Sequence, residues 1–179
     1  MKILILKSSG NKKGSSNMLA DEFIRGAKEN GHEITEYDVI RKDIRSCLGC
    51  NSCGMSGPCV LKDDYENELK GLIRQTDMIV FVMPLYYYNW PAQLKNVIDR
   101  FYSFTMELTR MHKKTALLAV AWDGSESSFA VTKAYYEKIC EYMQFEDCGT
   151  IYGTGCGTPD MTRRSGFPEK AYELGKSLQ

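Results

Sequence analysis

Four cysteines within thirteen residues are the side chains of this sequence most suited to chemistry. Cys47, Cys50, Cys53 and Cys59 follow the spacing Cys-x2-Cys-x2-Cys-x5-Cys, and three glycines and a proline lie between them. Glycine and proline exclude a long helix or strand here, so we expect a loop that can direct several sulfurs inward. Iron-sulfur clusters are bound by thiolates from a compact run of this kind. The first hypothesis for this segment is therefore an iron-sulfur site.

Two other interpretations of the four thiols remain open. Tetrahedral zinc usually takes its ligands as two separated pairs, whereas three thiols fall within seven residues here. The thiols could also stay free, or two of them at Cys-x2-Cys spacing could form a reversible disulfide. The chain has seven cysteines and no export signal. We therefore expect a cytoplasmic location, where a permanent disulfide is disfavoured.

The length and charge of the chain restrict its organisation and its partners. At 179 residues the sequence suits a single domain, residues 1–179, in which the cysteine-rich segment 47–59 forms a loop. Lysine plus arginine equals aspartate plus glutamate at 23 each. This balance gives no electrostatic reason to expect nucleic acid or an anionic membrane as a partner, and we exclude both.

Apolar runs of strand length alternate with helical patterns along the whole chain. Strands are expected at residues 3–6, 33–40, 78–83, 115–121 and 149–152, and amphipathic helices at 19–27, 65–73, 94–101, 129–143 and 168–178. Asn30 and Gly31 supply a stop signal for the first helix, and Asp63 and Asp64 are cap candidates for the second. Five strands interleaved with five helices predict an α/β fold in which a parallel sheet has helices on both faces.

The loop after the first strand is a candidate phosphate site. In an open doubly wound sheet, ligands bind beyond the carboxyl ends of the strands, where the strand order reverses. This loop leads into a helix whose N–H groups and dipole favour an anion, and Ser9, Ser15, Ser16 and Asn17 could complete the site. Its glycine spacing fits neither a nucleoside-triphosphate loop nor a dinucleotide turn. A serine-rich helix cap without a ligand is the alternative.

The loop after the third strand is aromatic. It carries three consecutive tyrosines, residues 86–88, and Trp90, which would suit a flat conjugated ring. A place in the core or at a subunit interface is the alternative for these rings. A phosphate site and an aromatic slot on neighbouring strand ends together indicate a mononucleotide with a large ring system. Flavin mononucleotide (FMN) is the obvious candidate.

Two motifs make the chain resemble the flavodoxin-like, NAD(P)H-dependent FMN reductase superfamily, and within it the iron-sulfur flavoproteins. The first is Ser-Ser-Gly-Asn at residues 8–11 with Gly-Ser-Ser-Asn at 14–17, in which Asn11 replaces the arginine usual in the family. The second, Pro-x-Tyr-x4-Pro-x3-Lys-x3-Asp-Arg, is more specific and runs from Pro84 to Arg100. The cysteine segment also looks like the cluster motif of the iron-sulfur flavoproteins.

The resemblance implies a fold, two cofactors and an assembly. The fold is a flavodoxin-like doubly wound sheet of five parallel strands in the order 2-1-3-4-5, and the assembly is a homodimer or homotetramer. Cys47, Cys50, Cys53 and Cys59 would bind a 4Fe-4S cluster beside the FMN of a neighbouring subunit. The residues implied to bind FMN are Ser9, Asn11, Ser15, Ser16, Asn17, Pro84, Leu85, Tyr86, Tyr87, Asn89 and, from the loop at 122–125, Gly124.

By the same resemblance, the chain would be an FMN-dependent oxidoreductase that moves electrons between a carrier such as ferredoxin, the cluster, FMN and a small acceptor. A cluster-free NAD(P)H-dependent FMN or quinone reductase is one alternative, and a non-catalytic thiol or zinc redox sensor is another. The cofactor would carry the chemistry, so no catalytic side chain is expected. Neither His32 nor His112 has a partner at ligand or triad spacing.

Five further residues with reactive or charged side chains are expected to be structural. Cys140 lies on the apolar face of its helix, and Cys148 and Cys156 are also expected to pack in the interior. Asp99 and Arg100 are expected to pair with each other or with a subunit partner.

Overall fold

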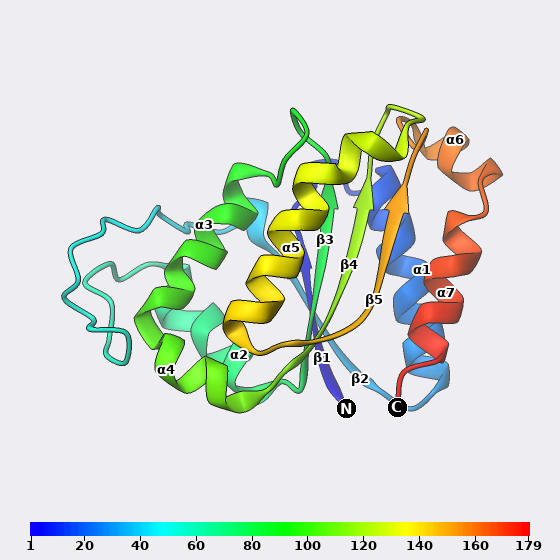
Figure 1. Cartoon of the computed structure of the whole chain (residues 1–179). Coiled ribbons are helices and arrows are strands. Elements are labelled where there is room, and N and C mark those ends of the chain that lie inside the picture. The colour runs from blue at the N-terminus through cyan, green and yellow to red at the C-terminus, as the bar shows by residue number, and fades with distance from the viewer.

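A five-stranded sheet forms the centre of the computed structural model, which describes all 179 residues (Figure 1). Neighbouring strands are all parallel and lie in the order β2-β1-β3-β4-β5. This confirms the fold class and the strand order predicted from the sequence. The strands are β1 (Lys2–Lys7), β2 (Glu33–Asp38), β3 (Met78–Pro84), β4 (Lys114–Val120) and β5 (Glu146–Gly153).

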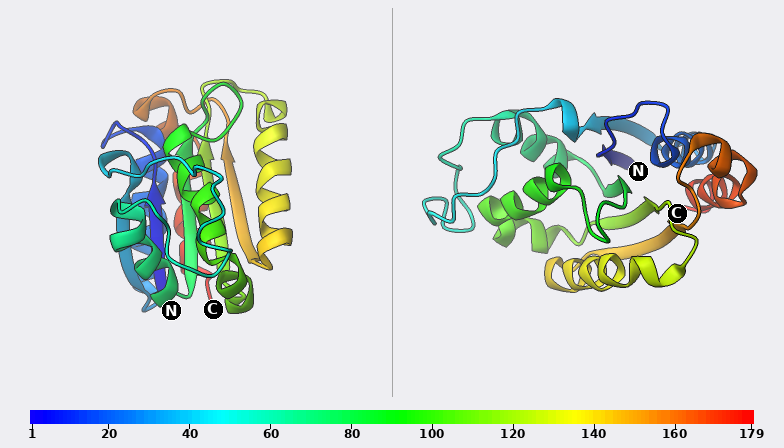
Figure 2. Two further views of the ribbon diagram at one scale, coloured as in Figure 1. Left: turned by 90° about the vertical axis from the view of Figure 1, so that its left-hand side faces the viewer. Right: turned by 90° about the horizontal axis from the view of Figure 1, so that it is seen from above.

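Helices cover both faces of the sheet (Figure 2). The helices are α1 (Ser15–Glu29), α2 (Lys70–Gln75), α3 (Ala92–Arg100), α4 (Thr105–Leu108), α5 (Ala130–Met143), α6 (Pro159–Arg164) and α7 (Phe167–Lys176). α1 and α7 lie on one face, and α2, α3 and α5 lie on the other. None of these helices combines the length and the apolarity that crossing a membrane requires.

The sheet buries apolar side chains on both faces, which explains why its strands are continuous apolar runs in the sequence. On β1, Ile3 and Ile5 pack beneath α1 and α7, whereas Leu4 and Leu6 face α2, α3 and α5. Successive side chains of a strand point to opposite faces, so the sheet separates two apolar cores. The loops that follow β1, β3, β4 and β5 gather at the carboxyl edge of the sheet (Figure 1).

The backbones of α1 and α7 are in direct contact. A Cβ atom on Gly26 of α1 would lie 2.1 Å from the carbonyl oxygen of Tyr172, and one on Gly175 of α7 would lie 2.1 Å from the carbonyl oxygen of Phe23. Any larger residue would push the helices apart, so both glycines are needed for this contact. The packing fixes α1, which begins at Ser15 directly after the loop that follows β1.

The structure differs from the predicted elements in several places. The strand predicted at 33–40 ends at Asp38, because Val39–Arg41 form a 3₁₀ turn. The prediction lacks α4 and α6, because each is too short to show a repeating apolar pattern. β5 begins at Glu146 instead of Gly149, since the first residues of this edge strand are polar and exposed. The second helix begins with a π-helical turn, Tyr65–Leu69, that continues into α2.

Candidate functional site

A cavity of about 240 Å³, termed the switch-point cavity, opens at the carboxyl edge of the sheet. Seven of the residues that the sequence predicts to bind FMN line it: Ser9, Asn11, Ser15, Ser16, Pro84, Leu85 and Tyr86. The remaining walls are Gly14, Val120, Ala121, Trp122, Cys156 and Gly157. Two loops that are far apart in the sequence therefore meet between β1 and β3, where the strand order reverses.

The loop between β1 and α1 is held in shape by its own hydrogen bonds. The carbonyl oxygen of Asn11 accepts from the Ser9 hydroxyl at 3.4 Å and from the Gly14 N–H at 2.9 Å. It also accepts from the side-chain amide of Asn17 at 2.8 Å. Asn17 thus braces the loop and does not itself line the cavity. The other four residues predicted from this segment, Ser9, Asn11, Ser15 and Ser16, do line the cavity.

The start of α1 presents unused hydrogen-bond donors to the switch-point cavity. Gly14 is the N-cap and no side chain caps the helix, so the N–H groups of the first turn have no acceptor within the helix. The Ser16 hydroxyl is buried without a hydrogen-bond partner, in a residue that is 1% exposed. A buried hydroxyl without a hydrogen-bond partner destabilises the folded protein unless a ligand supplies that hydrogen bond. These donors and the helix dipole together suit a phosphate group.

The tyrosine turn, Tyr86–Asn89, forms the second wall of the cavity. Its end residues exchange backbone hydrogen bonds at 3.2 and 3.1 Å, and Tyr87 and Tyr88 are left-handed, with φ of 46° and 64°. Tyr86 lines the cavity, whereas Tyr87 is 99% exposed. Asn89 braces the turn by accepting from the Trp90 N–H at 2.8 Å. Of the predicted ring contacts within the turn, the structure places Tyr86 at the cavity and Tyr87 and Asn89 outside it.

Trp90 does not contribute to an aromatic slot at the carboxyl edge. Its ring packs against Phe81 of β3, with the centroids 5.3 Å apart, and against Tyr135 and Tyr136 of α5. Trp90 is 6% exposed and belongs to the core on that face of the sheet. The core interpretation is therefore correct for this ring, and the ring-binding interpretation is wrong.

Trp122 is an aromatic residue of the cavity; the sequence predicts a flavin contact from its loop, residues 122–125, but assigns that contact to Gly124. It is 71% exposed, and its ring lies against Gly157, where a Cβ atom would come within 2.1 Å of Cε3. The Gly155 N–H donates to the carbonyl oxygen of Asp123 at 2.8 Å and joins the two loops. Gly124, the residue predicted from this segment, does not line the cavity. A tryptophan directly after a buried strand was the signal that could have identified the position.

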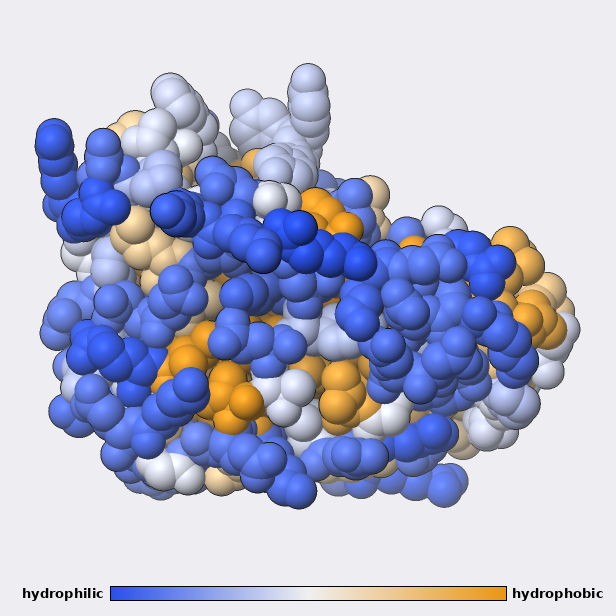
Figure 3. Space-filling view, turned by 180° about the vertical axis from the view of Figure 1, so that it is seen from behind, coloured by the Kyte–Doolittle hydropathy of each residue, from blue (hydrophilic) through white to orange (hydrophobic).

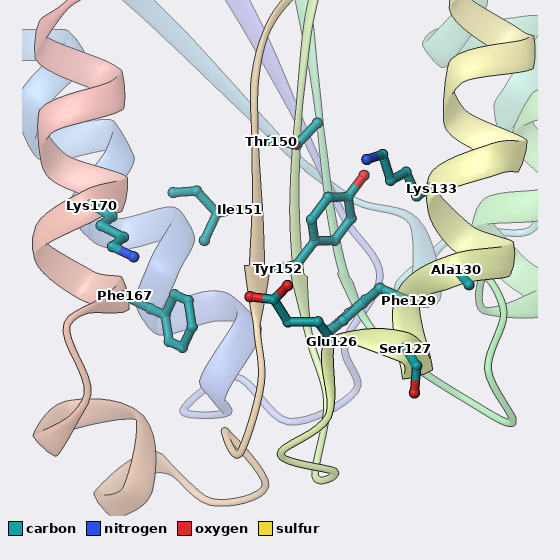
Figure 4. A pocket seen from close by; sticks show the side chains of 10 residues that line it. All are labelled: Glu126, Ser127, Phe129, Ala130, Lys133, Thr150, Ile151, Tyr152, Phe167 and Lys170. Atoms are coloured by element: carbon teal, nitrogen blue, oxygen red, sulfur yellow. The ribbon is translucent and has the colours of Figure 1, made fainter.

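A larger cavity, of about 530 Å³, lies beside β5 and away from these loops (Figure 4). Phe167 and Lys170 of α7 stand on one side of β5, and Phe129 and Lys133 stand on the other. None of the predicted site residues lines this cavity. None of its lining residues has a buried polar side-chain atom without a partner. The switch-point cavity is therefore the better candidate for a specific ligand site, although it is smaller.

The cysteine loop, residues 47–59, projects from the body of the molecule beside α3 and α4 (Figure 1). Its four cysteines line one pocket of about 20 Å³. Cys47 and Cys50 are exposed, Cys53 and Cys59 are half-buried, and none forms a disulfide. The structure thus brings the four predicted ligand residues to one place, and none of them lines the switch-point cavity.

Apolar side chains surround the pocket of the cysteine loop. Leu48, Val60, Leu61 and Tyr102 contribute to its walls. Leu48 and Val60 are also 65% and 50% exposed. Hydrophobic atoms are visible at the projecting end of the molecule, on the right in the view from behind (Figure 3). The thiols therefore lie in an apolar environment close to the surface.

The thiols do not converge on one point. No three His, Cys, Asp or Glu side chains of the chain form a group that could hold a metal ion. Tetrahedral zinc, with Zn–S bonds of about 2.3 Å, needs its sulfurs close together. A cluster of four irons takes four thiolates as ligands, which is the number of cysteines that this loop carries. Ser52 lowers the pKa of the Cys50 thiol through its hydroxyl and its backbone N–H, which favours the thiolate.

Arg100 pairs with Asp63, so the prediction of a pair between Arg100 and its neighbour Asp99 is wrong. Arg100 Nη1 lies 2.7 Å from Asp63 Oδ2 and Nη2 lies 3.1 Å from Oδ1. Asp99 accepts from Lys95 instead, because residues one turn apart share a helix face and adjacent residues do not. Burial alone would lower the pKa of Arg100, but hydrogen bonds to Asp63 raise it above its ordinary value.

The three cysteines outside the loop differ in burial. Cys140 and Cys156 are buried, which confirms the prediction for them, whereas Cys148 is only partly buried because it lies on the edge strand β5. Cys156 also lines the switch-point cavity.

The names of curated proteins similar to this chain refer to iron-sulfur flavoproteins and to FMN-dependent quinone reduction. An iron-sulfur flavoprotein of Archaeoglobus fulgidus is 34% identical over 100 residues, which cover 56% of this chain and 45% of that protein. An FMN-dependent NADH:quinone oxidoreductase of Shewanella sp. is 35% identical over 107 residues, which cover 55% of this chain and 54% of that protein. The matches therefore span about half the length of these relatives.

Similarity in fold extends over the whole chain. The solved structure of an NAD(P)H:quinone oxidoreductase from Methanothermobacter marburgensis matches with a TM-score of 0.78 and 21% identity, and the match covers 100% of this chain and 96% of that one. A family model described as a flavodoxin-like fold matches residues 1–176. The strand order agrees with that match. This chain therefore belongs to the flavodoxin-like fold family.

Proposed function

We propose that this protein is an FMN-dependent oxidoreductase of the iron-sulfur flavoprotein type, which moves electrons between a carrier, a 4Fe-4S cluster and FMN to a small acceptor. The observation that carries the proposal is the composition of the switch-point cavity. The unpartnered Ser16 hydroxyl and the uncapped start of α1 lie at one side, and Leu85, Tyr86 and Trp122 lie at the other. A ligand with a phosphate at one end and a flat ring at the other satisfies both sides.

Different residues of the cavity would contact the phosphate and the ring of FMN. Ser9, Ser15 and Ser16 would hold the phosphate, with Asn11 shaping the loop, because hydroxyls and free N–H groups meet there. Pro84, Leu85 and Tyr86 would contact the ring, and Trp122 would contribute a further aromatic surface. At about 240 Å³ the cavity is smaller than the roughly 300–1,000 Å³ of typical ligand pockets. Part of the ring would therefore stay accessible to other reactants.

FMN, when bound, supplies the ability to take up two electrons and to release them one at a time. The chain contributes binding and orientation, and no acid or base side chain is required for electron transfer. NAD(P)H or a carrier such as ferredoxin would be the electron donor.

The cysteine loop would hold the second redox group. Four thiols around one small apolar pocket are the donor set of a 4Fe-4S cluster. None of these cysteines lines the switch-point cavity. This separation favours electron exchange with the FMN of a neighbouring subunit, and therefore a homodimer or homotetramer.

Absorption spectroscopy of protein purified without oxygen tests the proposal, together with iron, sulfide and zinc analysis and titration with FMN. We expect a flavin spectrum, broad cluster absorbance and about four iron and four sulfide per chain. Cys50→Ala should remove iron and leave FMN bound, because Cys50 does not line the switch-point cavity. Colourless protein that does not bind FMN at micromolar concentration would contradict the whole proposal.

A cluster-free NAD(P)H-dependent quinone reductase is the second candidate. It is favoured by the thiols, no three of which are placed to hold a metal ion, and by the similarity to the Shewanella protein. Flavin absorbance without iron, together with quinone-dependent oxidation of NAD(P)H, selects this function. Stoichiometric iron and sulfide select the first, and bound zinc without turnover indicates a redox sensor.

A further inference from the structure

The cysteine loop has no regular secondary structure, yet side chains of the neighbouring helices bind both its base and its tip. The base consists of two chain segments, residues 44–46 and 61–64, which lie on either side of the cysteines. The tip consists of residues 49–57. Each of the two regions is bound by a different cation that the folded chain buries almost completely: Arg100 at the base and Lys70 at the tip.

Arg100 joins the two segments of the base to α3. Its two Nη atoms bind the Asp63 carboxylate, and Nη1 also donates to the carbonyl oxygen of Arg45 at 3.0 Å. Nη2 lies 3.5 Å from the carbonyl oxygen of Leu61. Asp63 Oδ2 accepts in turn from the Arg45 N–H at 3.0 Å. One guanidinium thus contacts both ends of the loop at once, which the single ammonium of a lysine could not do.

Asn96 of α3 strengthens the same base. Its side-chain amide donates to the carbonyl oxygen of Ile44 at 3.1 Å, and its Oδ1 accepts from the Ser46 hydroxyl at 3.0 Å. Together with Arg100, one turn later on α3, it fixes the segment that leads directly into Cys47.

Lys70 binds the tip of the loop. Its Nζ donates to the carbonyl oxygen of Gly57 at 3.1 Å, two residues before Cys59, and the residue is 3% exposed. The Tyr102 hydroxyl donates to Asn51 Oδ1 at 2.8 Å. The Met106 N–H donates to the carbonyl oxygen of Met55 at 3.2 Å. The tip is therefore bound to α2 and to residues on both sides of the start of α4.

Two buried cations are a costly way to stabilise a fold. A buried ion pair can usually be replaced by apolar side chains without loss of stability, so stability does not explain its presence. Arg100 pairs with the Asp63 carboxylate and Lys70 with that of Glu66 at 3.4 Å. Both cations also donate to carbonyl groups of a loop that has no strand or helix to satisfy them. Their common property is contact with the cysteine loop.

We infer that Arg100 and Lys70 are positioning residues that hold the cysteine loop folded against α2, α3 and α4 whether or not a metal is bound. The inference rests on the proposed function only for the identity of the group that the thiols receive. It differs from the behaviour of zinc fingers, in which metal binding itself folds the chain.

Trypsin digestion of the full chain, before and after removal of metal, tests this inference. Arg45 and Lys62 flank the cysteines and are natural cleavage sites, and Lys12 and Lys13 in the loop after β1 serve as internal controls. In the wild-type protein we expect the sites at residues 45 and 62 to stay protected after metal removal. Cleavage rates report the population of the opened loop.

The decisive variant replaces both partners of the ion pair, Asp63→Met with Arg100→Met. Removal of both charges should leave the fold and FMN binding intact, while cleavage after residue 45 becomes about tenfold faster or more. The bond after residue 62 is left out of this comparison, because the substitution of Asp63 itself changes how fast trypsin cuts there. The matched control is Arg74→Met with Glu107→Met. This pair is also bidentate, but it lies on the surface and does not contact the loop. In the control, cleavage should be unchanged.

Two further measurements distinguish positioning from general stability. Lys70→Met should speed the reaction of the half-buried Cys53 and Cys59 with a thiol reagent, because the backbone between them is released. After reconstitution with iron and sulfide, Arg100→Lys should change the electron paramagnetic resonance spectrum of the reduced cluster, and Arg74→Lys should not.

Two results would overturn the inference: wild-type protein without metal cut as fast as the double variant, or a double variant as resistant as wild type. A protected loop that takes up no iron would overturn the proposed cluster and leave the inference standing. Loss of FMN binding in the wild type would overturn the proposed function alone.

Discussion

The ring of Trp122 lies against the backbone of Gly157, so closely that a Cβ atom on residue 157 would fall 2.1 Å from Cε3 of the indole. Gly157→Ala must therefore displace Trp122 from the switch-point cavity. We expect the affinity for FMN to fall by about two- to tenfold, the value of one aromatic contact. Gly124→Ala is the matched control, because its Cβ atom would meet nothing within 4 Å. Equal affinities in the two variants would exclude a role for Trp122.

Ser16→Ala tests the phosphate end of the same cavity. The hydroxyl has no partner within the protein, so its removal should not lower the free energy of unfolding. Loss of a hydrogen bond to a charged phosphate, about 1.5–3 kcal/mol, should weaken FMN binding by about ten- to a hundredfold. Riboflavin lacks the phosphate and is the control ligand. If both ligands lose affinity equally, residue 16 does not face the phosphate.

Asp63 should make stability depend on pH in the acid range. Burial pushes its pKa upward, but hydrogen bonds from Arg100 and from the Arg45 N–H outweigh this and hold the pKa below its ordinary value of 3.8. The stabilisation is therefore present above pH 3.8 and is lost as the pH falls through the lower value in the folded protein. Asp63→Asn should cost about 3–5 kcal/mol at neutral pH, because it leaves Arg100 buried without a counter-charge.

Urea unfolding of wild type and Asp63→Asn across the acid range measures this dependence. The difference in unfolding free energy between the two proteins should shrink as the pH drops below 3.8. A difference that stays constant down to the lowest pH would show that the carboxylate is not what Arg100 recognises.

Gly26→Ala should destabilise the fold, since its Cβ atom would lie 2.1 Å from the carbonyl oxygen of Tyr172. The helices would have to separate, at a cost of about 1–3 kcal/mol or more. Gly71→Ala in α2 is the matched control: nothing lies within 4 Å of its Cβ position, and alanine favours a helix over glycine by about 0.5–1 kcal/mol. The midpoint of thermal unfolding should therefore fall in Gly26→Ala and rise in Gly71→Ala. A shift in the same direction in both variants would refute the close contact of α1 and α7.

Strand positions could be predicted because local and global signals agree, whereas the strand order came from the resemblance to the flavodoxin-like family. Ile3 to Leu6 and Met78 to Met83 are apolar throughout, as strands covered on both faces must be, and the loops after them carry the site. The serine run and Tyr86 were accessible for the same reason, since they directly follow such strands.

Side-chain directions in the loops could not be predicted. Trp90 and Tyr87 are close in sequence, yet one is 6% and the other 99% exposed, because two left-handed residues reverse the chain between Tyr86 and Asn89. The partner of Arg100 lies 37 positions away and depends on how the cysteine loop returns to α2. Contacts of this kind are set by tertiary packing, which no local pattern encodes.

The contact of α1 with α7 has a consequence for anything that occupies the cavity. The N-terminus of α1, which would accept an anion, belongs to the helix that packs backbone to backbone against α7 at Gly26 and Gly175. Rigidity at Ser16 is thus supplied by residues translated long after it. The nascent chain must therefore extend past residue 176 before α7 can hold α1 in place.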